Sequence, residues 1–584
     1  MGRIWRVSGP VVIAEDMRGS QVYEVVDVGD ERLTGEIIGL EQDKAVIQVY
    51  EDTVGLRVGE PVVGTGEILM CELGPGMVGN IYDGVQRSLV TMIEDIGDFL
   101  HRGVRTDALD RNRKWEFVPT VKAGDTVQEG DVIGTVQETG LIEHRIMVPI
   151  GLGGKILEIS EGKFTILDTV AVLEENGTKT PLTLMQRWPV RKPRLYKRRL
   201  DPVNLLVTGT RIIDYLFPLA LGGKAAIPGG FGTGKTVNLQ QMARWSQTQL
   251  NIYVGCGERG NEMADVLHSF KKLRDPNTDR LLQEKEIFIA NTSNMPVVAR
   301  EISIFIGITM AEYFRDMGYD ILLVADSTSR WAEAMREIGA RLEETPGEEG
   351  FPTYLGSRLA TFYERSGRVE CLGRPERTGS ATVIGSVSPP GADFSEPVTQ
   401  STLRIVDALY SLDVALANRR HFPTINWLQS YSLYSDSVGL WWKKEVDPEY
   451  HTVRDRALVT LQREAELEEI VRLVGPEALP EEDRLLLLVA RMIREDFLMQ
   501  SAYHPVDTYT PPERSHKMLA TIIRFADTAR ELSEQGMMVN GIQGLKIVPR
   551  ISRMKDVPLE ELDTYIKDLW SDMEKLVTTR EGGM

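Results

Sequence analysis

Residues 229–236 read Gly-Gly-Phe-Gly-Thr-Gly-Lys-Thr, the complete G-x-x-x-x-G-K-[ST] pattern of a phosphate-binding loop. The loop stands between a short apolar run, residues 225–227, and a stretch compatible with a helix, residues 237–245. Backbone N–H groups can ring a phosphate only when such a loop leaves a strand and opens a helix whose positive end faces the anion. The pattern in this context predicts an α/β domain that binds a nucleoside triphosphate.

Several positions of the loop have a defined chemical task. Gly229 and Gly234 let the backbone approach the phosphates, because glycine has no Cβ. Lys235 is expected to reach the β- and γ-phosphates as a point charge, and the hydroxyl of Thr236 to take one coordination position of Mg²⁺. The residues expected to bind the nucleotide here are Gly229, Gly230, Phe231, Gly232, Thr233, Gly234, Lys235, Thr236 and Val237.

The length and charge of the chain limit the class of protein. At 584 residues the chain is too long for one core, and it predicts roughly three or four domains. Lys and Arg number 67 against 86 for Asp and Glu, which gives a formal charge of −19. Because such a charge repels polyanions, no nucleic acid is expected as a partner.

The cysteines indicate the redox compartment, and the lengths of the apolar stretches indicate whether the chain could span a membrane. Cys71, Cys256 and Cys371 are scattered without a C-x-x-C spacing, which disfavours a disulfide framework and a thiolate zinc site and fits a reducing cytoplasm. No stretch approaches the roughly 20 consecutive apolar residues of a membrane span, and the N-terminus lacks the apolar block of a signal peptide. Any membrane role is therefore expected to be peripheral, on the cytoplasmic side.

Two β-rich blocks precede the loop. Up to about residue 70, short alternating runs punctuated by Gly and Asp predict an N-terminal β-barrel, residues 1–70. Residues 115–184 form a second β-rich block, whose Gly-Asp turns resemble those of biotinyl and lipoyl modules. Because no Lys stands at the centre of a tight hairpin, we interpret this block as an inserted β-rich bulge domain. Residues 71–114 connect the two blocks.

The rest of the chain divides into an α/β part and a helical part. Residues 187–199 include the basic run Lys197-Arg198-Arg199, which we interpret as a solvated face of a connector. Apolar strands such as residues 321–325 then alternate with helical patterns, as in a parallel sheet covered on both faces. We assign residues 185–434 to this phosphate-loop α/β domain and residues 435–584 to a C-terminal helical bundle.

The second half of the nucleotide site is expected downstream of the loop. An apolar strand ends in Asp326, which fits an acid that holds Mg²⁺ through its water shell. Residues 257–262 read Gly-Glu-Arg-Gly-Asn-Glu and closely follow another strand. Hydrolysis needs an acid that orients or deprotonates water, and cations that meet the charge developing at the γ-phosphate. We assign the first role to Glu258 and the second to Arg259, with Arg330 as a further cation.

Together these motifs resemble one family. The phosphate loop with its internal Phe231, the Gly-Glu-Arg-Gly-Asn-Glu loop and residues 326–334 look like those of the catalytic A (alpha) subunit of V-type and archaeal-type rotary ATPases. The inserted block agrees with the same family, as do residues 74–76, 83–87, 290–296 and 346–350. The resemblance covers nearly the whole chain in order. One departure is the segment 195–200, which is more basic than is usual in that family.

The resemblance implies roles for matching residues. Lys235 and Thr236 are implied to bind phosphate and Mg²⁺, and Glu258 to activate water. Arg259 and Arg330 are implied to lie near the γ-phosphate, and Asp326 to be the acid at the strand end. Tyr503 and Tyr509 resemble the aromatic positions that sandwich the adenine base in related subunits. Buried tyrosines that pack a helix end are the alternative interpretation of these two residues, and Phe422 is a third candidate for the base.

The resemblance also implies an assembly. It indicates a recombinase-like fold and a hexamer in which three such chains alternate with three non-catalytic B-type nucleotide-binding subunits. An arginine from the neighbouring subunit then completes each site. The other expected partners are central-stalk and peripheral-stalk subunits and, indirectly, a membrane sector that moves H⁺ or Na⁺. Mg²⁺ with ATP or ADP is the expected cofactor.

Two other interpretations stay open at this point. The inserted block disfavours another hexameric motor on the same fold, such as a secretion-type ATPase or an RNA helicase, and the charge of −19 further disfavours the helicase. The presence of both Lys235 and Glu258 disfavours a non-catalytic nucleotide-binding subunit, which needs no water-activating acid.

Overall fold

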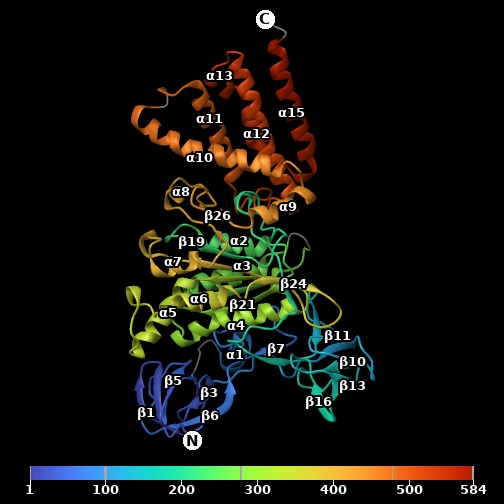
Figure 1. Ribbon diagram of the computed structural model, residues 1–584, viewed down its shortest axis with the longest axis vertical. Helices are drawn as coiled ribbons and strands as arrows, with labels where there is room; N and C mark the ends of the chain where they lie inside the picture. The colour runs from blue at the N-terminus through green and yellow to red at the C-terminus, as the bar shows by residue number, and fades with distance from the viewer. Residues whose placement is uncertain (1, 98–101, 276–278, 476–477, 582–584) are drawn as a thin grey trace. The chain divides into compact units, whose positions relative to one another are not determined.

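The computed structural model describes residues 2–97, 102–275, 279–475 and 478–581 (Figure 1). The chain folds into two compact units. The first comprises Met1–Asp201, Leu221–Ala226 and Thr248–Val406, and the second comprises Pro202–Ala220, Ile227–Gln247 and Asp407–Met584. Because each unit gathers separate stretches of chain, residues far apart in the sequence share one core.

A closed six-stranded barrel begins the first unit, and its strands are blue in Figure 1. The strand order is β1-β2-β5-β4-β3-β6, and β1 pairs with β6 to close the barrel. Side chains alternate between the two faces of a strand, so Val26, Val28, Ile37 and Ile47 are completely buried inside. The strands are β1 (Gly2–Ser8), β2 (Val11–Glu15), β3 (Glu24–Val28), β4 (Leu33–Glu41), β5 (Lys44–Val49) and β6 (Pro61–Ile68).

Two four-stranded sheets form the inserted block. One has the order β12-β11-β9-β14 and the other β10-β13-β15-β16. Phe117, Ile133 and Ile156 are completely buried and give the block a core. Strands β7 (Met70–Leu73) and β17 (Gln186–Pro189) pair, so the chain enters and leaves the block side by side. The other strands are β9 (Trp115–Pro119), β10 (Thr126–Val127), β11 (Val132–Gln137), β12 (Glu143–Met147), β13 (Gly154–Ile159), β14 (Gly162–Phe164), β15 (Ala171–Glu175) and β16 (Thr178–Leu182).

A parallel sheet forms the centre of the first unit. Its strands run in the order β24-β22-β20-β21-β8, and β23 and then β18 pair antiparallel beside β24. Strands β20 and β22 read as continuous apolar runs and are buried along nearly their whole length, as a sheet covered on both faces requires. The strands are β8 (Ile81–Tyr82), β18 (Arg198–Leu200), β20 (Leu250–Cys256), β21 (Glu286–Asn291), β22 (Asp320–Asp326), β23 (Gly367–Glu370) and β24 (Thr378–Val387).

Helices pack on this sheet. Helix α4 (Val297–Asp316) contacts β20, β22 and β24 and is buried on nearly all sides. Helix α5 (Thr328–Arg341) packs on α4 and buries Trp331, Met335 and Ile338, which recur at helical spacing. The other helices of this unit are α1 (Leu89–Ile96), α3 (Gly260–Lys272), α6 (Leu355–Tyr363) and α7 (Pro397–Leu403).

The phosphate loop belongs to the second unit. Strand β19 (Lys224–Pro228), whose residues from Ile227 onward belong to this unit, leads into the loop, and helix α2 (Lys235–Trp245) follows it. The N–H of Leu412 donates to the carbonyl of Pro228 at 2.9 Å, which ties the strand end to the segment after β25. The short elements nearby are β25 (Ala408–Leu409), α8 (Val414–Asn418) and β26 (Tyr431–Ser432).

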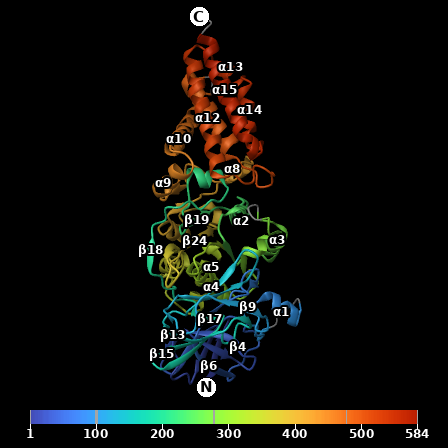
Figure 2. The ribbon, with the colours of Figure 1, turned by 90° about the vertical axis from the view of Figure 1, so that its right-hand side faces the viewer.

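The long helices of the second unit are orange and red in Figures 1 and 2. Helices α12 and α15 run side by side in both views, and α12 also contacts α10 and α11. Leu519, Ile522 and Phe525 of α12 are completely buried between these helices. The helices are α9 (Ser435–Glu445), α10 (Tyr450–Val474), α11 (Glu481–Met492), α12 (Pro512–Glu534), α13 (Val539–Gln543), α14 (Ile547–Ser552) and α15 (Leu559–Glu581).

The fold class expected from the sequence is confirmed. The chain contains a closed N-terminal barrel, an inserted β-rich block, a phosphate-loop α/β part and a helical C-terminal part. Within the part of the chain that the structure describes, no helix combines the length and apolarity needed to cross a membrane.

Candidate nucleotide-binding site

The phosphate loop opens α2 in the second unit. Gly232 and Gly234 both have a φ of +79°, a left-handed conformation that favours glycine. Gly234 is the N-cap of α2, so the first N–H groups of the helix and the positive end of its dipole face the loop. A Cβ on either glycine would meet nothing within 4 Å. Backbone conformation, and not lack of space, therefore selects glycine at these two positions.

Internal contacts hold the loop in shape. Thr233 donates from Oγ1 to the carbonyl of Gly230 at 2.8 Å, and Thr424 donates to the carbonyl of Thr233 at 2.6 Å. A Cβ on Gly229 would lie 2.7 Å from Cβ of Leu412 and 2.8 Å from Oγ1 of Thr233. Close packing therefore selects glycine at position 229.

Lys235 is the first residue of α2. Its Nζ donates to the carbonyl of Gly229 at 3.0 Å, so the ammonium group lies over the loop. Thr236 follows and is half-buried, and Phe231 in the loop is 87% exposed. The ammonium group and the start of the helix thus converge on one place, as phosphate binding requires.

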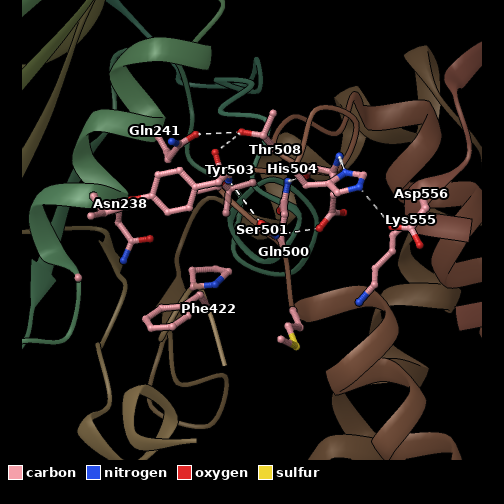
Figure 3. A pocket seen from close by; sticks show the side chains of 17 residues that line it. Asn238, Gln241, Phe422, Gln500, Ser501, Tyr503, His504, Thr508, Lys555 and Asp556 are labelled. Carbon is pink, nitrogen blue, oxygen red and sulfur yellow. Dashed lines mark hydrogen bonds and ion pairs between the residues drawn. The ribbon is translucent and has the colours of Figure 1, made fainter. Parts of the chain in front are cut away.

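A cavity of about 480 Å³ begins where the phosphate loop ends, within the second unit (Figure 3). Gly234, Val237 and Asn238 line it from the loop and the first turn of α2. The other walls include residues 422–423, several residues between 499 and 508, and residues 555–556. The phosphate loop and the cavity are therefore continuous.

Two aromatic rings border this cavity. Tyr503 is 86% exposed and Phe422 is 44% exposed, and Figure 3 shows both rings on the side of the cavity where Asn238 lies. Exposed ring faces of this kind can stack on a nucleotide base. Tyr509 is placed differently, since its ring stacks on Trp245 with centroids 5.1 Å apart. Tyr509 is not one of the described residues that line the cavity, so the structure brings Tyr503 and Phe422 together there instead.

A buried hub fixes the wall that carries Tyr503. The guanidinium of Arg211 donates to Oδ1 of Asp507 at 2.5 Å and to two backbone carbonyls of this wall. Gln500 accepts the N–H of Arg211 at 2.9 Å and donates to the carbonyl of Asp507 at 2.9 Å. Sequence reasoning missed these residues because Arg211 lies 289 and 296 positions from its two partners, and no local pattern marks them.

Glu258 lies in the turn between β20 and α3, in the first unit. Gly257 before it has a φ of +75°, and a Cβ there would lie 2.8 Å from Cβ of Arg330 and 3.0 Å from Nε of Arg300. The carbonyl of Glu258 accepts the N–H of Ser293 at 2.9 Å. These contacts hold the half-buried Glu258 at the carboxyl end of a parallel strand, where ligands of open α/β sheets bind.

Asp326 ends β22, the strand next to β20. It is buried, and its two oxygens accept hydrogen bonds from the hydroxyls of Tyr253 at 2.9 Å and Ser386 at 2.6 Å. Burial and then the charge of Asp326 raise the pKa of Tyr253 well above its ordinary value, so Tyr253 keeps its proton and remains a donor. The structure thus places Asp326 and Glu258 at or just beyond the ends of adjacent strands.

Two further predicted cations lie on this side of the sheet. Arg330, in the first turn of α5, donates to Glu333 at 2.8 Å. That hydrogen bond, opposed by partial burial and helped by the charges of Glu333 and Glu258, raises the pKa of Arg330, which therefore stays charged. The side chain of Arg259 is 63% exposed and lies 3.8 Å from Glu262.

A third cation, Arg300, was not among the sequence candidates. It is buried and donates from Nη2 to the carbonyl of Ser293 at 3.2 Å, while its Nε has no hydrogen-bond partner among the described residues. The charged pair Arg300-Glu301 within the largely apolar helix α4 is the sequence signal that could have found it.

Comparisons with known proteins match the chain part by part. The beta-barrel domain of the ATP synthase alpha/beta family matches residues 4–66, and the barrel-sandwich domain of its subunits matches residues 106–191. The nucleotide-binding domain of the same family matches residues 209–432. The C-terminal domain of V and A type ATP synthase matches residues 440–540.

Relatives that match over nearly their full length identify the family more specifically. The A subunit of the A-type ATP synthase of Staphylothermus marinus is 61% identical over 575 residues, which are 98% of this chain and 96% of the relative. The chain belongs to the family of A subunits of A-type ATP synthases. The A subunit of Methanopyrus kandleri is 59% identical over 97% of this chain and 96% of its own, and that of Thermococcus onnurineus is 56% identical over 99% of both. The resemblance named from the motifs is confirmed.

A solved structure shares the fold more distantly. The assembled ATPase EscN of the enteropathogenic E. coli type III secretion system superimposes with a TM-score of 0.64, covering 90% of this chain and all of that one. Its sequence identity of 19% shows the fold alone.

Proposed function

We propose that the chain is the catalytic subunit of an archaeal-type rotary ATPase and interconverts ATP and water with ADP and phosphate. The observation that carries the proposal is the continuity of the phosphate loop with the cavity bordered by Tyr503 and Phe422. A nucleotide needs both a cradle for its phosphates and ring faces for its base. Relatives named as the A subunit of A-type ATP synthase, at 56 to 61% identity over nearly the whole chain, support it.

Each charged residue has a proposed role in this chemistry. Lys235 binds the β- and γ-phosphates, and Glu258 orients or deprotonates the attacking water. Arg259 and Arg330 stabilise the negative charge that develops at the γ-phosphate. The placement of Glu258 and Asp326 beside adjacent strand ends supports this assignment, because catalytic groups of open α/β sheets gather at that edge.

Mg²⁺ fits the donors that the chain offers. Among the described residues, no group of three His, Cys, Asp or Glu side chains could hold a metal ion alone. Mg²⁺ instead keeps several waters and binds through substrate phosphates with one or two protein oxygens. Thr236 would supply a hydroxyl. Both oxygens of Asp326 already accept hydrogen bonds from Tyr253 and Ser386, so this carboxylate would act through a water. The ion would neutralise phosphate charge.

The chain is proposed to work inside a larger complex. Three copies alternate with three non-catalytic B-type subunits, and an arginine of the neighbour completes each site. The helical C-terminal part transmits site closure to a central stalk. Peripheral-stalk subunits hold the hexamer on the cytoplasmic side of a membrane sector that moves H⁺ or Na⁺, and no nucleic acid takes part.

The competing functions have weaker support. A secretion-type ATPase shares 19% identity and the fold alone, against 61% for the Staphylothermus marinus relative. An RNA helicase would have to hold a polyanion with a formal charge of −19. A non-catalytic subunit would not need an acid held like Glu258 by a left-handed glycine and a backbone hydrogen bond.

Hydrolysis of Mg-ATP tests the proposal. The chain is assayed alone and after reconstitution with its candidate B-type partner, each as wild type and as Glu258→Gln. We expect turnover only in the mixture, and its loss in Glu258→Gln while ATP still binds. If Glu258→Gln hydrolyses ATP as fast as wild type, the water-activating acid is misassigned. If turnover does not depend on the partner, a homohexameric motor replaces the proposal.

A further inference from the structure

The first unit contains a second cavity, of about 610 Å³, beside α4, α6 and β18. None of the described residues that line it belongs to the proposed catalytic set. Four of the lining side chains are cationic and two are carboxylates. The cations are Arg199, Lys224, Arg315 and Arg365, and the carboxylates are Glu312 and Glu364.

Buried charges at this cavity form one network. Arg365 donates to Oε2 of Glu312 at 2.5 Å, and the backbone N–H of Arg194 donates to the same oxygen at 3.1 Å. The guanidinium groups of Arg194 and Arg315 each donate to Asp316 at 2.7 Å. All five residues are buried, so water screens these charges poorly.

The network has more positive than negative charge, since three guanidinium groups face two carboxylates. Burial acts to lower the pKa of Arg315, but Asp316 and Glu312 together raise it above its ordinary value, so the group stays charged. Burial raises the pKa of the neighbouring Cys371 thiol to about 11, so Cys371 adds no negative charge near neutral pH. An uncompensated buried charge is costly, and an anion in the cavity would compensate it.

Arg365 also has an unused donor. Its Nη1 donates to the carbonyl of Val190 at 3.0 Å, and its Nη2 donates to Thr309 and Glu312. Its buried Nε has no hydrogen-bond partner in the part of the chain that the structure describes. Buried donors without a partner are rare. This nitrogen is closed to water, so a ligand in the cavity would interact with Arg365 through its charge and not through this N–H.

Arg199 brings the basic run of the connector to the cavity. The interpretation of residues 197–199 as a solvated face holds for Lys197 and Arg198, whose exposed side chains pair with Glu370. Arg199 is exposed as well, but it also donates to the carbonyl of Ser366 at 2.9 Å and lines the cavity. The adjacent arginines 198 and 199 therefore form a matched pair, of which one lines the cavity.

We propose that this cavity binds a small tetrahedral oxyanion of the size of inorganic phosphate or sulfate. Arg199, Lys224, Arg315 and Arg365 supply the positive charge. Guanidinium groups suit such a ligand because their N–H donors match two oxygens of an oxyanion at once. The two carboxylates do not outweigh the cations, because four cationic side chains line the cavity and Glu364 is exposed to solvent.

Sulfate titration of the full chain tests the proposal. The Lys235→Ala background weakens the anion site of the phosphate loop, and chloride keeps the ionic strength constant. Isothermal titration calorimetry is expected to find one sulfate bound per chain. Arg199→Gln in this background is expected to weaken binding about tenfold or more, because one charge-assisted contact is lost. The matched control Arg198→Gln is expected to leave the affinity unchanged.

Two further measurements guard against a folding defect and locate the anion. Arg199→Lys keeps the charge but loses the two-donor fork, so it is expected to bind sulfate more tightly than Arg199→Gln and more weakly than wild type. The unfolding midpoint without sulfate is compared for all variants. A crystal of the Lys235→Ala chain soaked in selenate is expected to give an anomalous peak beside Arg199 and Arg365. Absence of saturable binding, equal losses in Arg198→Gln and Arg199→Gln, or a peak elsewhere would overturn the proposal. ATP turnover plays no part, so the result is independent of the proposed function.

Discussion

Arg211 and Asp507, 296 positions apart in the chain, form a buried ion pair in which Nη1 lies 2.5 Å from Oδ1. Oδ2 of Asp507 accepts the N–H of Ser501 at 2.8 Å, so the same carboxylate also holds the segment that leads to Tyr503. Two residues outside the phosphate loop therefore fix the aromatic wall of the candidate base site.

Loss of this pair is expected to affect both stability and nucleotide binding. Asp507→Asn leaves the buried Arg211 without its counter-charge, which typically costs about 3–5 kcal/mol. The variant should unfold at a clearly lower temperature and bind a fluorescent ATP analogue more weakly. As a control, Asp563→Asn breaks a surface pair with Lys517 and should change neither property. Similar behaviour of the two variants would contradict the structural role of the hub.

The aromatic residues at the cavity can be ranked by nucleotide affinity. Stacking on one ring contributes about 1–3 kcal/mol per base, so Tyr503→Ala and Phe422→Ala should each weaken ATP binding by about 5- to 150-fold. Tyr509→Phe, which removes the hydroxyl that accepts from Gln247 and keeps the ring on Trp245, should change the affinity little. Fluorescence titration with ATP measures these affinities.

Inorganic triphosphate provides the control for the ranking, because it lacks a base and should bind all three variants like wild type. If Tyr509→Phe weakened ATP binding more than Tyr503→Ala, the base would lie elsewhere than in the cavity.

Arg300 is expected to position Glu258. Its Nη2 donates to the carbonyl of Ser293 at 3.2 Å, and the N–H of Ser293 donates to the carbonyl of Glu258 at 2.9 Å. A displacement of a catalytic group by about 1 Å can cost on the order of 100-fold in rate. Arg300→Ala should therefore lower kcat in the reconstituted hexamer by about 10- to 100-fold with little change in ATP affinity.

A conservative variant separates positioning from a general loss of structure. Arg300→Lys keeps the charge and can still reach a carbonyl, so it should recover part of the rate. Lys272→Ala, at the exposed end of α3, should hydrolyse ATP like wild type. Equal losses of kcat and ATP affinity in Arg300→Ala would indicate a structural role only.

Local patterns predicted the parts of the fold that depend on a few consecutive residues. The phosphate loop and the strand that ends in Asp326 could be read directly, because turn chemistry and apolar runs are local signals. The sequence did not indicate the partners of Asp326, since Tyr253 and Ser386 lie 73 and 60 positions away. The placement of the aromatic residues at the cavity also depends on contacts between distant parts of the sequence. Motif resemblance selected Tyr503 and Tyr509, but only tertiary contacts show that Tyr509 packs on Trp245.

The buried carboxyl of Glu286 predicts how the stability of the folded chain changes with pH. It opens β21 completely buried, Oε1 accepts from Nδ2 of Asn251 at 2.6 Å, and Oε2 has no partner among the described residues. Burial, partly offset by Asn251 and Lys285, raises the pKa of Glu286 from an ordinary 4.5 to about 8. Between these values the folded state holds a proton that the unfolded state has released. Stability therefore falls as pH rises from about 4.5 to about 8.

Glu286→Gln removes this titration and keeps the acceptor for Asn251. The thermal midpoint of wild type should fall more between pH 5 and pH 9 than that of the variant. For comparison, roughly 1 kcal/mol shifts the midpoint of a domain of about 150–250 residues by about 2–4 °C. Other buried acids with raised pKa values, such as Asp214 at about 7 and Asp496 at about 6, titrate in both proteins, so the difference isolates Glu286. Parallel midpoint curves for wild type and Glu286→Gln would show that Glu286 is ionised in the folded chain at pH 5.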